Sequence, residues 1–152
     1  MLYVTQILPN IWWSYTDNSK PINDNDKDYL NKFCQHHKIS QVIKIDKYLT
    51  FWNKSTQFIF DIKKQIEKYE NDKLIMIINK IINLINSNYL KSIDTIIHSN
   101  IYNEIGLIIW ICFFKKFAKL PIHIISNNIN DKLNCTIILT EKEKRFMQLN
   151  NL

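Results

Sequence analysis

Residues 92–117 read SIDTIIHSNIYNEIGLIIWICFFKKF, and they pass from a β-branched run through a short polar loop into a long apolar segment. Isoleucine recurs in Ser92–His98, which predicts a buried strand. Gly106–Phe117 is almost entirely apolar and has the length of a helix, so we expect it to be enclosed on most sides. A buried strand that leads directly into a buried helix is typical of an α/β domain with parallel strands.

The chain before this stretch supplies the other predicted strands. Tyr3–Tyr15 alternates between apolar and polar residues and is rich in aromatics, with Pro9 and Asn10 as a turn signal. This segment predicts a short hairpin or two edge strands. Gln41–Asp46 and Thr56–Ile62 are short β-branched or aromatic runs, and both are strand candidates.

Two helices are predicted among these strands. Residues 16–28 form a polar loop that ends in a helix cap at Asp26 or Asp28, and a helix follows over Tyr29–His37. Residues 62–87 then show apolar side chains at helical spacing, which predicts one long helix facing the core. The predicted face consists of Leu74, Ile77, Ile78, Ile81, Ile82 and Ile85.

After the apolar helix, a weaker helix is predicted from Pro121 to Ile129, and a loop over residues 131–136. Thr140 and Glu143 have the spacing of a capping box, so we expect a final helix to begin there. That helix offers three apolar side chains for packing, namely Phe146, Met147 and Leu149. The order of elements predicts an α/β fold with a mostly parallel sheet flanked by helices.

Length and composition favour one domain. The chain has 152 residues, of which 46% are hydrophobic, enough for one sizeable core. Its longest unbroken apolar run, Leu107–Phe114, is well short of the roughly 20 residues of a membrane helix, and no signal pattern opens the chain. Cys34, Cys112 and Cys135 are widely spaced and odd in number, which indicates a reducing compartment. We therefore expect a cytoplasmic protein.

The formal charge of +6 suggests an acidic partner or nucleic acid, but composition gives another explanation. The chain contains 19 Lys with the single Arg145, beside 29 Ile and 19 Asn, a pattern that AT-rich coding produces. No lysine cluster alternates with aromatics along a helix face. Nucleic-acid binding is therefore not expected.

Two groups of side chains each allow two interpretations. Cys34, His36 and His37 resemble part of a metal cluster, but a fourth ligand at suitable spacing is missing, so we predict a surface helix end and neither metal nor cofactor. The second group consists of four aromatic side chains. They either form an exposed patch for interaction or pack in the ordinary way, and both alternatives stay open. They are Trp12, Trp13, Tyr48 and Trp52.

Residues 98–106, HSNIYNEIG, occupy the place of the signature loop of cysteine-dependent protein phosphatases, which reads His-Cys-x-x-Gly-x-x-Arg-Ser/Thr. The loop itself has diverged, but segments along nearly the whole chain resemble the small dual-specificity phosphatases, especially their poxviral members. The resembling segments are Val4–Trp13, Ile39–Ile45, Asp46–Tyr48, Gly106–Lys116 with Leu120 and Pro121, and Arg145–Leu149. The resemblance implies a single phosphatase-like domain over residues 1–152, with a sheet of about five strands.

That family uses a low-pKa thiolate, a cradle of backbone amides with an arginine, and an aspartic acid as general acid. In this chain Ser99 stands in the cysteine position, and Ile105 stands in the arginine position, or Glu104 if one residue is deleted. Tyr102 stands in the glycine position, where a left-handed backbone would cost a bulky residue roughly 1–2 kcal/mol. We therefore expect a differently shaped loop whose empty pocket is filled by the Tyr102 ring.

The remaining positions do not complete a catalytic set. Asp61 follows the strand where the family's acid loop begins, but a match to the poxviral pattern places Lys63 or Lys64 there, so a surface carboxylate or a cap is the favoured interpretation of Asp61. His98 could act as a base for Ser99, yet adjacent strand residues point to opposite faces, and a buried, satisfied histidine is the favoured alternative.

The sequence therefore predicts a pseudophosphatase that works by binding a protein, host or viral. Ile101 and Tyr102, at the mouth of the former pocket, are the favoured contact, with Gly106 closing the degenerate loop. Rival hypotheses are a phosphoprotein shield or basic adaptor, and an enzyme of altered chemistry that uses Ser99 or Glu104. A homodimer, the host cytoplasm and packaging in the virion are further expectations from the poxviral resemblance.

Overall fold

The computed structural model describes residues 2–17, 22–45, 54–67 and 72–151, and its centre is a five-stranded sheet. The strands lie in the order β1-β2-β5-β3-β4. Their bounds are β1 Leu2–Leu8, β2 Ile11–Thr16, β3 Gln41–Lys44, β4 Thr56–Ile59 and β5 Thr95–His98. β1 and β2 pair antiparallel, whereas β2–β5, β5–β3 and β3–β4 are parallel. The predicted α/β fold with a mostly parallel sheet is confirmed.

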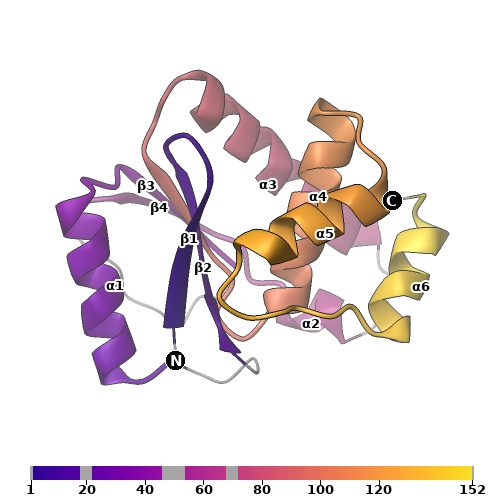
Figure 1. Ribbon diagram of the computed structural model, residues 1–152, viewed down its shortest axis with the longest axis horizontal. Coiled ribbons are helices and arrows are strands. Elements are labelled where there is room, and N and C mark those ends of the chain that lie inside the picture. The colour runs from indigo at the N-terminus through magenta and orange to yellow at the C-terminus, as the bar shows by residue number, and fades with distance from the viewer. Residues whose placement is uncertain (1, 18–21, 46–53, 68–71, 152) are drawn as a thin grey trace.

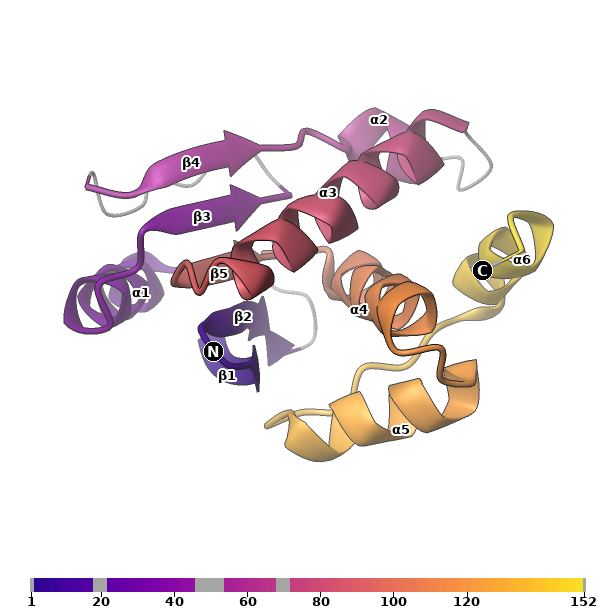
Figure 2. The ribbon, with the colours of Figure 1, turned by 90° about the horizontal axis from the view of Figure 1, so that it is seen from above.

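Helices cover both faces of the sheet (Figures 1 and 2). α1 lies alone on one face, where Leu30 and Cys34 pack with Val42 and Ile96. α3, α4 and α5 lie on the other face, with α6 at the periphery beside α4. The bounds are α1 Asp24–His36, α2 Lys63–Ile66, α3 Asp72–Leu90, α4 Asn103–Phe117, α5 Ile122–Lys132 and α6 Glu141–Leu149.

The predicted hairpin is present, and it places two neighbouring tryptophans on opposite faces of the sheet. Asn10 adopts a φ of 65° in the turn between β1 and β2. Because side chains alternate along a strand, Trp13 is fully buried in the core on the α4 side, and Trp12 packs against Phe33 and His37 on the α1 side. Of the two alternatives for Trp13, ordinary packing is the one observed, so Trp13 is not part of an exposed patch.

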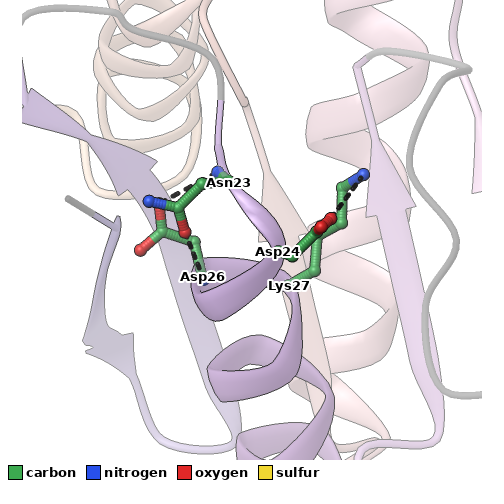
Figure 3. Close-up of polar contacts among 4 residues, drawn as sticks. All are labelled: Asn23, Asp24, Asp26 and Lys27. Atoms are coloured by element: carbon green, nitrogen blue, oxygen red, sulfur yellow. Dashed lines mark hydrogen bonds and ion pairs between the residues drawn. The ribbon is translucent and has the colours of Figure 1, made fainter.

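α1 begins earlier than predicted, at Asp24, and its cap is Asn23 (Figure 3). The Asn23 side chain accepts a hydrogen bond from the Asp26 amide at 2.8 Å, and the Asp26 carboxylate accepts one from the Asn23 amide at 3.3 Å. The predicted cap at Asp26 or Asp28 was therefore wrong. Asp26 is instead the third helical residue of a reciprocal capping box, and a polar sequence concealed the start of the helix.

The long apolar segment after β4 forms α2 and α3, whose described parts are separated by residues 68–71. Five of the six residues of the predicted apolar face are buried, and Ile77 is half-buried. The predicted core-facing side of α3 is therefore confirmed. The helix extends to Leu90, three residues beyond the predicted end at Ser87.

α4 begins at Asn103, three residues before the predicted start, and each residue from Ile105 to Phe113 is buried as predicted. The last three residues, 115–117, are exposed, so the predicted enclosure was wrong for the end of the helix. The end of the chain differs in detail from the prediction. Thr140 precedes α6, but its hydroxyl donates to the Glu143 side chain rather than accepting from a backbone amide, so the predicted capping box was wrong. Phe146 and Met147 are buried, whereas Leu149 remains exposed and does not contribute to packing.

Candidate functional site

The candidate site is the connection from β5 to α4, residues 99–102. β5 is the middle strand of the sheet, with β2 and β3 parallel to it on either side. The carboxyl ends of these three strands meet at one edge of the sheet, and loops at such edges bind ligands in open α/β folds. The connection is short, because α4 already begins at Asn103.

Ser99 points into the protein. Its side chain is fully buried, and its hydroxyl oxygen accepts a hydrogen bond from the Trp13 indole nitrogen at 3.0 Å. The same hydroxyl lies 3.4 Å from the Ser14 carbonyl oxygen and 3.4 Å from the Asn103 side-chain oxygen, and it can donate its single proton to one of them. The hydroxyl is thus occupied by internal hydrogen bonds on the core side of the loop.

Asn103, the first residue of α4, joins this loop to β2. Its side-chain oxygen accepts from the Thr16 amide at 3.3 Å, and its side-chain nitrogen donates to the Thr16 carbonyl oxygen. Asn103 is itself buried. Sequence reasoning missed this residue; the available signal was a polar side chain at the start of an otherwise apolar helix.

Gly106 lies inside α4 rather than in the loop. A Cβ atom at this position would be 2.6 Å from the Cζ2 atom of Trp13, far inside van der Waals contact. The indole of Trp13 therefore lies directly across the helix, and the single glycine of the chain allows that approach. The same indole holds the Ser99 hydroxyl, so packing and hydrogen bonding fix the loop together.

His98 is a buried core residue. Its Nδ1 atom lies 2.6 Å from the Ser14 hydroxyl. Burial, and next the nearby Lys44 charge, lower the pKa of His98 to about 3, so its ring is neutral near neutral pH. The interpretation of His98 as a buried histidine with a hydrogen-bond partner therefore describes the observed arrangement.

The left-handed backbone conformation that the family motif would require of Tyr102 is found at Asn100 instead. Asn100 has a positive φ of 50°, whereas Tyr102 has a φ of −100° and ψ of 50°. Asn is among the residues that tolerate the left-handed region best, so the turn is placed where the sequence can adopt it. The Tyr102 amide donates to the Ser99 carbonyl at 2.8 Å, and its ring is half-buried against the main core.

Ile105 and Glu104, the two alternatives for the arginine position, point in different directions. Ile105 is 1% exposed and belongs to the core. Glu104 is half-buried, and it lines a groove of about 360 Å³ beside the loop. The groove, which we call the Glu104 groove, is lined by Thr16, Asn103, Glu104, Cys135, Thr136, Ile137 and Ile138.

The other predicted contact residues lie outside this groove. Ile101 is half-exposed on the loop, and Trp12 is half-buried beside α1. Trp52 lies outside the described residues. The structure therefore brings Ile101 and Tyr102 to one loop and leaves Trp12 on the opposite face of the sheet.

Within the described part of the chain, the candidate general acid Asp61 and the candidate metal ligands of α1 lie in separate parts of the fold. Asp61 is exposed, and its carboxylate lies 3.5 Å from the Lys63 amide, one residue before the N-cap of α2 at Ile62. His36 and His37 are exposed at the end of α1, and His37 stacks on Phe33. Among residues 2–17, 22–45, 54–67 and 72–151, no group of three potential metal ligands occurs.

No protein-family model matches this sequence, and no curated protein matches it. Solved structures do match its fold. The human tyrosine phosphatase-like serine/threonine/tyrosine-interacting protein has a TM-score of 0.67 and 11% identity over 97% of this chain and 95% of its own. Human DUSP28 has a TM-score of 0.67 and 5% identity over 95% of this chain and 91% of its own. DUSP15 has a TM-score of 0.61 and 15% identity over 95% of this chain and 85% of its own.

These matches confirm the expected fold, that of the dual-specificity phosphatases, with a five-stranded and mostly parallel sheet. At such low identity they show the fold alone. None of the helices in the described part of the chain has the length and hydropathy needed to cross a membrane.

Proposed function

We propose that this chain is a catalytically inactive, dual-specificity-phosphatase-like protein that acts by binding another protein. The observation that supports this most directly is the state of Ser99. The residue in the nucleophile position is buried, and its hydroxyl is engaged by the Trp13 indole. A nucleophile must reach the phosphorus atom, and a hydroxyl on the core side of the loop does not offer that approach.

The chemistry of the surrounding groups supports the same proposal. A serine hydroxyl needs a base to become a nucleophile, and the Nδ1 atom of the adjacent His98 is already engaged by Ser14. Ile105 in the arginine position lies in the core and carries no charge for a phosphate. Loss of a nucleophile alone has cost on the order of a million-fold in other enzymes.

One structural neighbour supports the binding class, because its name describes a phosphatase-like interacting protein. The proposed partner is a host or viral protein, with a second copy of the chain as the alternative. The proposed place of action is the host cytoplasm, with packaging in the virion in addition. Both rest on the poxviral resemblance and on the lysine-, isoleucine- and asparagine-rich composition.

The first experiment is hydrolysis of p-nitrophenyl phosphate by the wild type, by Ser99→Cys, and by the double variant Ser99→Cys with Ile105→Arg. We expect turnover at the buffer background for all three, because the side chain at position 99 is buried and contacts the Trp13 indole, and burial disfavours the thiolate that would attack phosphorus. Wild-type turnover that disappears in Ser99→Ala would overturn the proposal and favour an enzyme of altered chemistry.

The second experiment distinguishes protein binding from phosphate binding. Calorimetric titration with tungstate, a phosphate mimic, at low salt is expected to give no saturable heat at millimolar ligand. Saturable one-to-one binding that is lost when residues 99–106 are replaced would contradict this expectation. It would support the rival function, a shield for phosphorylated partners.

A further inference from the structure

The Glu104 groove differs from a phosphate site in the sign of its charge. Among the described residues that line it, Glu104 is the only one with a formal charge. Glu104 is in the first turn of α4, where its carboxylate offsets the partial positive charge, roughly +0.5, at the start of a helix. The described lining of the groove therefore carries a negative formal charge on a chain of formal charge +6.

Residues 135–138 line another part of the groove, and hydrogen bonds hold this segment in place. The Asn130 side chain accepts a hydrogen bond from the Ile137 amide at 3.0 Å and donates one to the Ile137 carbonyl at 3.3 Å. This pair of bonds fixes segment 136–138 against α5. Ile137 is then buried, and its neighbour Ile138 is 73% exposed at the edge of the groove.

The exposed Ile138 also lines a second, larger groove of about 560 Å³. Thr136, Ile137 and Ile138 line both grooves. Residues 136–138 are therefore shared by two neighbouring grooves, and such a surface can bind an extended piece of another chain.

We propose that the Glu104 groove binds a lysine or arginine side chain of a partner protein. This inference rests on the proposed function and assigns the chemistry of its partner. The apolar stem of the partner's side chain lies against Ile138, and its cationic head pairs with the Glu104 carboxylate. Lysine and arginine carry this combination of a long apolar stem and a charged tip. A phosphorylated side chain would meet the same carboxylate and be repelled by it.

The test is an NMR titration of the ¹⁵N-labelled full chain with N-acetyl-arginine amide as a cationic probe, and with phenyl phosphate as an anionic one. The cation is expected to shift the amides of Glu104 and residues 135–138 in a saturable way. Glu104→Gln is expected to weaken that binding roughly three- to fivefold, the size of a partly exposed ion pair. Glu67→Gln removes an exposed carboxylate outside the groove lining and should leave the affinity unchanged. Raising the salt from 50 to 500 mM should weaken binding to the wild type.

The outcomes test the groove assignment separately from the proposed binding function. If Glu104→Gln binds the cation as well as the wild type does, or if the shifts do not saturate, the groove assignment is wrong, while the proposed function still stands on the hydrolysis assay. If phenyl phosphate shifts the groove amides instead, the assignment is overturned and the phosphate-binding alternative replaces the proposed function.

Discussion

Trp13 contributes two different contacts with one side chain. Its ring packs across Gly106 in α4, and its indole nitrogen donates to Ser99 in the loop before that helix. The residue is fully buried, so both contacts are made in a low-dielectric interior, where an unpaired polar group is costly. The conformation of the loop thus depends on a residue 86 positions away in the sequence.

The close approach at Gly106 can be tested by adding one methyl group. Gly106→Ala should gain up to about 1 kcal/mol from helix propensity but lose more, because overpacking costs about 1–3 kcal/mol. We expect a net loss of about 1–2 kcal/mol and a fall of roughly 5 °C in Tm. Thermal unfolding of the variant measures it, with Lys115→Ala, at an exposed position of the same helix, as the control. A variant as stable as the wild type would show that Trp13 can move away freely.

At the scale of the elements, the attachment of α4 to β2 depends on Asn103. Its side chain satisfies both backbone groups of Thr16 at the end of β2, beyond the point where the parallel ladder to β5 stops. In a buried environment, each of those groups would otherwise cost about 1–3 kcal/mol. Asn103 therefore replaces hydrogen bonds that neither the sheet nor the helix provides.

Asn103→Ala should destabilise the protein by about 2–4 kcal/mol, because it leaves the Thr16 amide and carbonyl without this partner. Urea denaturation measures the loss, and Asn127→Ala, at an exposed position of α5, is the matched control. Equal midpoints for the two variants would mean that water replaces the Asn103 side chain at no cost.

The capping box of α1 leads to a second prediction at this scale. Asn23→Ala removes the side chain that accepts from the Asp26 amide, and the expected cost is about 1 kcal/mol. Asn25→Ala changes the same residue type two positions later, on an exposed site within the helix, and should have no such cost. The comparison is made by urea denaturation, and a larger effect at Asn25 than at Asn23 would contradict the assigned cap.

Apolar periodicity was sufficient to predict the strands, the buried α4 and the core face of α3, because burial requires those side chains to repeat on one face. Helix ends were predicted less well. Capping depends on which polar side chain turns toward a free amide, and the sequence near Asn23 and Thr140 contains several candidates. In the site, the resemblance directed attention to Ser99 and Ile105, and their proposed roles stay predictions, whereas the partnership of Asn103 with Thr16 joins residues 87 positions apart and could not be predicted.

At the scale of the whole molecule, the buried His98 makes stability depend on pH. The unfolded chain binds a proton at His98 below its ordinary pKa of 6.5, whereas burial and Lys44 prevent the folded chain from doing so until the pH approaches about 3. The contribution of the neutral His98 to the free energy of unfolding is therefore fully present above pH 6.5 and is lost as the pH falls from there toward 3.

Between pH 7 and pH 5, this linkage should lower the free energy of unfolding by about 2 kcal/mol. Urea denaturation at several pH values across this range measures the slope. His98→Asn should flatten it, whatever its effect on stability at pH 7, whereas His36→Asn, at an exposed position, should not. Parallel slopes for the wild type and His98→Asn would show that the imidazole becomes protonated in the folded state.

The position of β5 has a consequence for the order of assembly during synthesis. β5 is the middle strand of the sheet, yet it is the last of the five in the chain, at Thr95–His98. Among the described residues, β5 joins the β1–β2 hairpin to the β3–β4 pair, because β2 and β3 both pair with β5 and not with each other. A ribosome that has released only the first 90 residues therefore presents two separate half-sheets with open edges, and these can join only after residues 95–98 have emerged.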